Sequence, residues 1–99
     1  MALQPHWKES MFYMVVERFK NRDAKSIYGR FRQKGRMMPA GLTYIDSWVE
    51  ENFDRCFQLM ECDDPQLLEE WAGHWRDLID FEFVPVRQSK KVVEMMSSA

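Results

Sequence analysis

Residues 11–19 read MFYMVVERF, an almost continuous run of aromatic, β-branched and other apolar side chains. This composition is typical of a central β-strand, whose two faces are both covered in a folded protein. The sequence predicts three more strands, at residues 42–51, 55–62 and 81–87. A short polar turn separates the second strand from the third, so these two are expected to form a hairpin.

Two helices are predicted between these strands. Residues 24–38 carry apolar side chains at helical spacing, follow a possible cap at Asp23 or Asn21, and end before Pro39. The triplet Asp63-Asp64-Pro65 is typical of a helix start, and an apolar stripe then continues to about residue 80. The tryptophans of that stripe are expected to pack in the core.

The order of elements is therefore β-α-β-β-α-β. It predicts an α+β fold, a ferredoxin-like sandwich with a four-stranded antiparallel sheet and both helices on one face. The 99 residues suffice for one domain with a modest core. We expect a flexible extension over residues 1–10, the folded domain over residues 11–88, and a tail or short helix over residues 89–99.

The strands carry more apolar side chains than two helices can cover. One layer of helices seals one face of the sheet, and the other face must close against a second surface. Left bare, that face would form an apolar patch of several hundred Å², larger than monomers usually tolerate. A two-fold dimer uses the same patch twice, so the sequence predicts a homodimer through the sheet face.

Composition argues against several other classes of protein. The net charge is only −2, no apolar run is long enough to span a bilayer, and residues 1–10 lack the apolar segment of a signal peptide. A cytoplasmic protein with no membrane partner is expected. Cys56, Cys62, His6 and His74 match no metal or redox spacing, so neither a cofactor nor a metal is predicted.

Positive charge is concentrated in residues 20–36. This segment contains seven basic residues and one acidic residue, Asp23, so its net charge is +6. Such a segment can bind phosphate-rich partners. The third strand, however, lacks the glycine and aromatic pattern of RNA-recognition sheets. A solvated helix face explains the charge, and nucleic acid is not expected as a partner.

The alternation of side chains along each strand predicts which residues share a face. One set has no polar atoms and is expected to contact the helices: Phe12, Met14, Val16, Phe57 and Leu59. The other set mixes large and polar groups: Tyr13, Val15, Glu17, Cys56, Gln58 and Met60, which Tyr44, Asp46, Trp48, Phe83 and Arg87 could join. The pattern leaves open which side of the second and fourth strands faces the helices.

Six residues of the mixed set are candidates for a ligand cavity: Tyr13, Glu17, Tyr44, Asp46, Trp48 and Gln58. Glu17 interrupts an apolar strand, where it could act as an acid or base or orient a ligand. The alternative is a Glu at the strand end that pairs with Arg18, Arg55 or Arg87 or reaches solvent. Tyrosine and tryptophan beside a carboxylate and an amide could hold a small aromatic or carbonyl compound, yet they are also enriched in dimer interfaces.

Four blocks in order, MFYMVVERF, GLTYIDSW, RCFQLME and FEFVPV, resemble a small bacterial family of uncharacterised proteins that carries a domain-of-unknown-function label. The resemblance covers about residues 11–88. It implies the dimeric α/β-barrel superfamily, in which two ferredoxin-like subunits pair their sheets. That superfamily includes cofactor-free monooxygenases, isomerases, haem enzymes and domains without known activity, so the resemblance implies no catalytic residues.

These observations lead to two functional hypotheses. The first is a homodimeric α/β-barrel protein that holds a small apolar or aromatic ligand in a cavity between sheet and helices. The alternative is a cofactor-independent enzyme resembling a monooxygenase or an isomerase. Whether the protein is an enzyme stays open.

Overall fold

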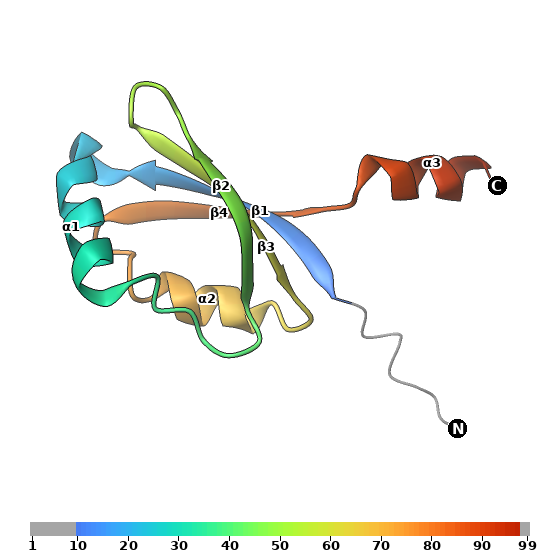
Figure 1. Cartoon of the computed structure of the whole chain (residues 1–99), viewed down its shortest axis with the longest axis horizontal. Coiled ribbons are helices and arrows are strands. Elements are labelled where there is room, and N and C mark those ends of the chain that lie inside the picture. Colours follow the sequence, from blue (N-terminus) through green and yellow to red (C-terminus); the bar gives the residue numbers. More distant parts are fainter. Residues whose placement is uncertain (1–9, 98–99) are drawn as a thin grey trace.

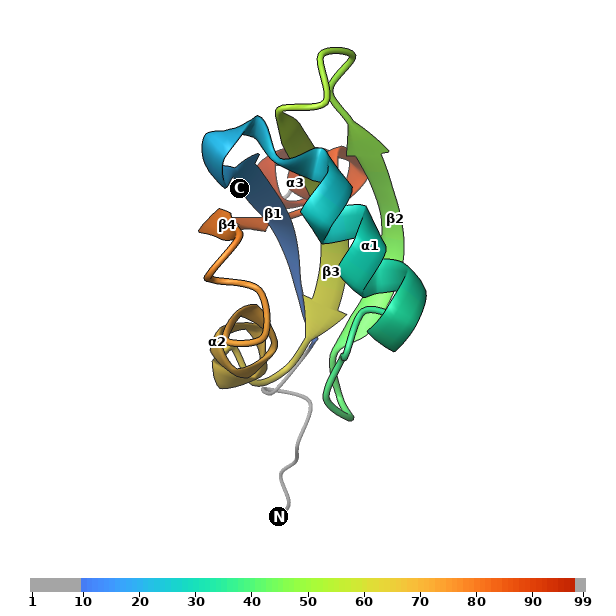
Figure 2. The same cartoon turned by 90° about the vertical axis from the view of Figure 1, so that its left-hand side faces the viewer.

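The computed structural model describes residues 10–97 and confirms the predicted fold class. Its elements are β1 (Met11–Phe19), the 3-10 turn η2 (Lys20–Arg22), α1 (Ala24–Lys34), β2 (Thr43–Val49), β3 (Arg55–Cys62), α2 (Gln66–Ala72), β4 (Ile79–Val86) and α3 (Ser89–Ser97). The strands form one antiparallel sheet in the order β2-β3-β1-β4. Helices α1 and α2 cover one face of it, the ferredoxin-like arrangement (Figures 1 and 2).

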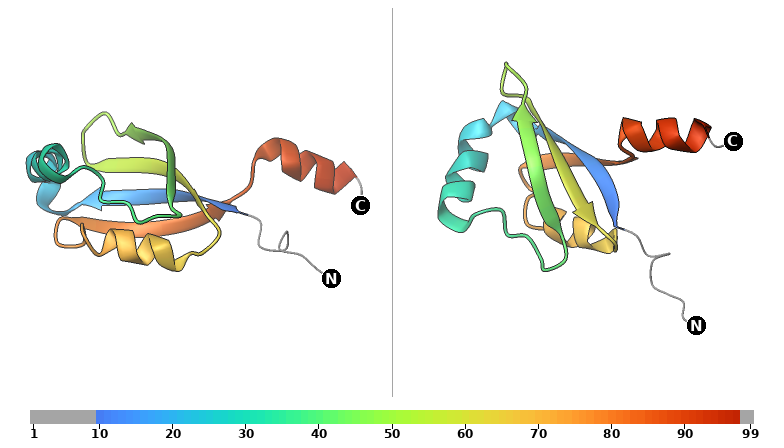
Figure 3. Two further views of the ribbon diagram at one scale, coloured as in Figure 1. Left: turned by 60° about the horizontal axis from the view of Figure 1, so that its bottom comes forward. Right: turned by 45° about the vertical axis from the view of Figure 1, so that its right-hand side comes forward.

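The two ends of the chain differ in what can be described. Except for Ser10, the expected N-terminal extension over residues 1–10 lies outside the described residues. Helix α3 projects beyond the end of β4, away from α1 and α2 (Figure 3). Across residues 10–97, no helix combines the length and apolarity needed to cross a lipid bilayer.

Both sheet-covering helices are shorter than the sequence pattern predicts. Asp23 caps α1 as expected, because its carboxylate accepts a hydrogen bond from the Ser26 backbone N–H at 3.1 Å. The helix then ends at Lys34, four residues before the predicted end, and the capping residue Gly35 adopts a positive φ of 68°. Helix α2 ends before Gly73, and irregular turns connect it to β4.

Gly35 offers a direct test of this early helix end. Its φ of 68° and ψ of −161° lie in a region that residues with a Cβ almost never adopt. We expect Gly35→Ala to lower the free energy of unfolding by about 1–3 kcal/mol, measured by urea denaturation. Gly29→Ala, inside α1 and with open space around its Cβ, is the matched control. It is expected to be stabilising by about 0.5–1 kcal/mol, and equal losses in both variants would contradict the backbone argument.

The core lies between the sheet and the two helices. It is built by the side chains that alternate along β1 and β3 together with one face of each helix: Tyr13, Val15, Phe19, Cys56, Met60, Cys62, Ile27, Leu68, Trp71 and Trp75. The predicted orientation of β1 and β3 is therefore wrong. The mixed set faces the helices, because Glu17 and Gln58 satisfy each other by a hydrogen bond inside the core.

The uncovered side of the sheet carries the purely apolar set instead. Strand register places these side chains together: Phe12, Met14, Val16, Trp48, Phe57, Leu59, Val84 and Val86. We call this surface the open sheet face. Acidic residues lie at its edges, Asp46 on β2 and Glu82 on β4, whereas the two central strands are apolar through their middle.

Candidate functional site

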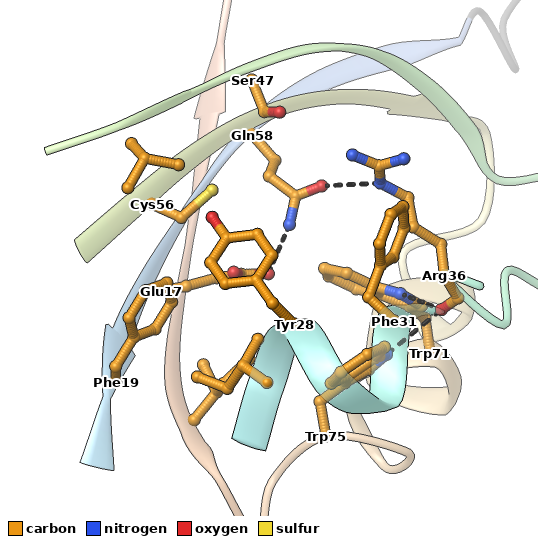
Figure 4. A pocket seen from close by; sticks show the side chains of 13 residues that line it. Glu17, Phe19, Tyr28, Phe31, Arg36, Ser47, Cys56, Gln58, Trp71 and Trp75 are labelled. Carbon is orange, nitrogen blue, oxygen red and sulfur yellow. Dashed lines mark hydrogen bonds between the residues drawn. The ribbon is translucent and has the colours of Figure 1, made fainter. Parts of the chain in front are cut away.

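A pocket of about 120 Å³ lies between the sheet and the two covering helices (Figure 4). Its walls come from all four strands, from α1 and α2, and from the segments that follow the two helices, and they are mostly aromatic or aliphatic. The lining residues are Glu17, Phe19, Ile27, Tyr28, Phe31, Arg36, Ser47, Val49, Cys56, Gln58, Trp71, Trp75 and Ile79. This volume is slightly below that of an apolar cavity of about 150 Å³ that can hold benzene, so the pocket is limited to a molecule of about one six-membered ring.

Three polar side chains form a chain of hydrogen bonds across this pocket. The Gln58 Nε2 amide donates to Glu17 Oε2 at 2.5 Å, and Arg36 Nε donates to Gln58 Oε1 at 3.3 Å (Figure 4). Glu17 is only 4% exposed and Gln58 only 6%. The amide therefore bridges a buried carboxyl group and a half-buried guanidinium group.

The surroundings of Glu17 change its acidity. Burial raises the pKa of the Glu17 carboxyl group to about 7, although the Gln58 hydrogen bond and the Arg36 charge act in the opposite direction. Desolvation wins because the neighbours are apolar and the one nearby cation is separated from Glu17 by the amide. A carboxyl group with this pKa can take up or release a proton near neutral pH.

Arg36 is held in place from both its backbone and its side chain. Its carbonyl oxygen accepts hydrogen bonds from the indole N–H groups of Trp71 and Trp75, at 3.0 and 3.1 Å. Its guanidinium carbon lies 3.6 Å from the ring centroid of Tyr44 and 5.1 Å from that of Phe31. Two helices and a strand thus fix the direction of one positive charge.

Tyr28 and Cys56 line the pocket together with Glu17. The Tyr28 ring extends from α1 across the pocket (Figure 4), and burial raises the pKa of its hydroxyl group. Burial, with a contribution from the Glu17 charge, raises the pKa of the Cys56 thiol to about 12. Cys56 therefore remains a neutral thiol and is no nucleophile at physiological pH. Both cysteines are free and buried.

The six candidate cavity residues have different positions. Glu17 and Gln58 line the pocket, and Tyr44 borders it, with its hydroxyl 2.6 Å from Ser47 Oγ. Tyr13 is buried on the same sheet face as Glu17 but lies four residues before it on β1, and it does not line the pocket. Asp46 and Trp48 lie on the open sheet face, because a bulge between Tyr44 and Asp46 shifts the alternation of β2.

Sequence reasoning did not identify Arg36, Tyr28 or Phe31 as pocket residues. Arg36 was assigned to a continuous helix, and the signal that could have revealed it is Gly35, a common helix terminator. Tyr28 and Phe31 lie at helical spacing, a pattern that also fits packing against the sheet without a ligand. Trp71 and Trp75 are buried as expected, but they also form a wall of the pocket.

No three His, Cys, Asp or Glu side chains within residues 10–97 are grouped so that they could hold one metal ion. Basic residues of the segment 20–36 form ion pairs on the surface: Lys20 with Asp80, Arg22 with Asp54, and Arg30 with Asp77.

Comparison with known proteins gives a family and nothing finer. A family model described as a domain of unknown function (DUF3303) matches residues 11–99. No curated protein and no solved structure matches the chain. The features of the chain that bear on function are therefore the pocket and the open sheet face.

Proposed function

The chain belongs to the DUF3303 family of domains of unknown function, and we propose that it is a homodimer in which each subunit binds a small aromatic ligand in its pocket. The observation that carries the ligand proposal is the Glu17–Gln58–Arg36 chain of hydrogen bonds within aromatic walls. Buried polar and charged groups cost folding free energy, so folding alone gives no reason for them. An apolar cavity with a few convergent polar groups is typical of a ligand site.

The open sheet face supports the homodimer. Its apolar centre on β1 and β3, with Asp46 and Glu82 at the edges, matches the apolar core and polar rim of a protein interface. Each large side chain that becomes buried contributes roughly 1.5–3 kcal/mol. A second copy of this chain presents the same patch, so one two-fold contact covers both. Two ferredoxin-like sheets paired in this way form the dimeric α/β barrel.

Helix α3 adds a second uncovered apolar surface. Val93, Met95 and Met96 are 63%, 50% and 70% exposed, and they lie on a helix that projects beyond the end of β4 (Figure 1). We include α3 in the proposed interface, since a partner subunit is the surface that pairing of the sheets would bring near it.

Two measurements test the two parts of this proposal. Native mass spectrometry of freshly purified protein tests the homodimer. We expect the mass of two chains, with or without an added small molecule. Binding itself is tested with benzyl alcohol, a neutral aromatic probe, by following the indole N–H signals of Trp71 and Trp75 in NMR spectra. Both indoles form pocket walls and donate to Arg36, so both signals are expected to shift. A monomeric mass, or unshifted indole signals, would contradict the corresponding part.

Blocking the pocket mouth gives a more specific prediction. Val49 lines the pocket and is 40% exposed, whereas Ile45 on the same strand is 41% exposed and does not line it. We expect Val49→Trp to weaken benzyl alcohol binding at least about tenfold, because the indole would occupy ligand space. Ile45→Trp is the matched control and is expected to bind as the parent protein does. Equal binding by both variants would place the ligand elsewhere.

The properties of Glu17 favour a second candidate function, a cofactor-independent isomerase. A carboxylate near its pKa can remove a proton from a carbon beside a carbonyl group, and the resulting acid can return it to another carbon. Such a reaction needs no oxidant or co-reactant. The test is solvent-deuterium exchange into small aromatic ketones. Exchange that is lost in Glu17→Gln would favour the enzyme, and exchange that persists in this variant would count against it.

A further inference from the structure

We propose that the ligand carries a carboxylate group, and that this group binds to the two terminal nitrogens of Arg36. The inference rests on the proposed ligand pocket and names its chemical class, a small aromatic carboxylate. It begins from the geometry of Arg36, whose hydrogen-bonding capacity is only partly used.

The guanidinium group of Arg36 has one occupied edge and one free edge. Its Nε donates to Gln58 Oε1, whereas among residues 10–97 neither Nη atom has a hydrogen-bond acceptor. Other arginines with restricted side chains meet a carboxylate: Arg30 binds Asp77 through both Nη atoms, and Arg55 binds Glu50 through Nε and Nη2. Arg36 has no such partner in the described chain, and the residue belongs to the pocket lining.

Arg36 is also oriented before any ligand arrives. The Tyr44 ring stacks on the guanidinium plane, and the two indole N–H groups fix the carbonyl oxygen of the same residue. A planar guanidinium group held in this way presents two parallel N–H donors, which match the two oxygens of a carboxylate. Because the group is preorganised, little conformational entropy is lost on binding.

The rest of the pocket fits the remainder of such a molecule. Phe31, Trp71, Trp75 and Tyr28 supply aromatic walls, and the volume of about 120 Å³ suits one ring. Glu17 does not repel the anion if it is protonated. The groups that face Glu17 are Gln58 and Cys56 from β3, Arg36 from the loop, and Tyr28 from α1, while β4 contributes the apolar Phe81. None of these is a second carboxylate.

The experiment compares benzoate with benzyl alcohol, two probes with the same ring and different charge, by NMR titration of the parent protein and two variants. We expect benzoate to bind at least about tenfold more tightly than benzyl alcohol at about pH 6. Arg36→Gln is expected to remove this preference while it still binds benzyl alcohol, which shows that the pocket is intact. Arg32→Gln, an exposed position on α1, is the matched control and is expected to keep the preference.

The pH dependence of benzoate binding is an independent test of the carboxylate proposal. A carboxylate placed near Glu17 favours its protonated form, so benzoate affinity is expected to fall as pH rises from about 6 to about 8.5. The same titration of Glu17→Gln is expected to show little dependence on pH.

The outcomes separate the two proposals. If neither probe binds, the ligand pocket itself is refuted. If benzyl alcohol binds as well as benzoate, and Arg36→Gln changes neither affinity, the pocket stands and the carboxylate assignment is overturned.

Discussion

Replacing Leu59 by Asp is expected to convert the proposed dimer into a monomer. Leu59 lies on β3 in the middle of the open sheet face, paired with Met14 on β1 and Asp46 on β2. In a sheet-to-sheet dimer, the new carboxylate would be buried without a partner in both subunits. That costs about 3–5 kcal/mol, so the dimer dissociation constant is expected to rise at least roughly 10²–10³-fold. Sedimentation velocity over a range of protein concentrations measures it.

The fold of the single chain should tolerate this substitution, because the open sheet face is not covered within the chain. Circular dichroism and urea unfolding of the variant establish this. Thr43→Asp is the matched control, since Thr43 is exposed on the same side of the sheet but at the end of β2, opposite Glu61. It adds the same charge at the rim and is expected to leave a dimer. A parent protein that remains monomeric at about 100 μM would refute the dimer directly.

The order and type of the principal elements could be predicted because each depends on local chemistry. The run MFYMVVERF has the composition of a central strand, and Asp23 caps α1 where the pattern of apolar residues begins. The excess of apolar sheet surface could also be predicted, because two helices can cover only one face of a four-stranded sheet. What local chemistry could not show was which side of β1 and β3 meets the helices.

The reason lies in Glu17 and Gln58. Their polar atoms argue for a solvent-facing or cavity-facing side when each strand is considered alone. Strand pairing places Gln58 on β3 within reach of Glu17 on β1, so each satisfies the other and both can be buried. A pair separated by 41 positions in the sequence cannot be identified from either strand.

The candidate site was only partly predictable for similar reasons. Glu17 and Gln58 were selected by their residue type, and both line the pocket. Arg36 reaches it only because α1 stops at Gly35, and its position depends on two indole groups from α2 and the turns that follow it. Asp46 was misplaced relative to Tyr44 by one bulge, since a single extra residue reverses every later side chain in a strand.

Glu17 is expected to make the stability of the protein fall as pH rises from about 4.5 to about 7. The pKa of Glu17 is raised from 4.5 to about 7 in the folded protein, so the folded state binds more protons than the unfolded state within this window. The favourable contribution is complete below the unfolded pKa and is lost by the time pH exceeds the folded pKa. A difference of this size corresponds to about 3 kcal/mol in the free energy of unfolding.

Urea denaturation of the parent protein and of Glu17→Gln, between about pH 5 and about pH 8 and at one protein concentration, isolates this effect. The glutamine cannot ionise, so its stability should lack the loss, and the variant should become the more stable form at the upper end. Carboxyl groups whose pKa lies below the usual range, such as those of Asp77 and Glu50, titrate below this window and leave the comparison intact. Parallel stability curves for the two proteins would mean that Glu17 is already ionised and solvated at neutral pH, and the pocket would then lose its buried acid.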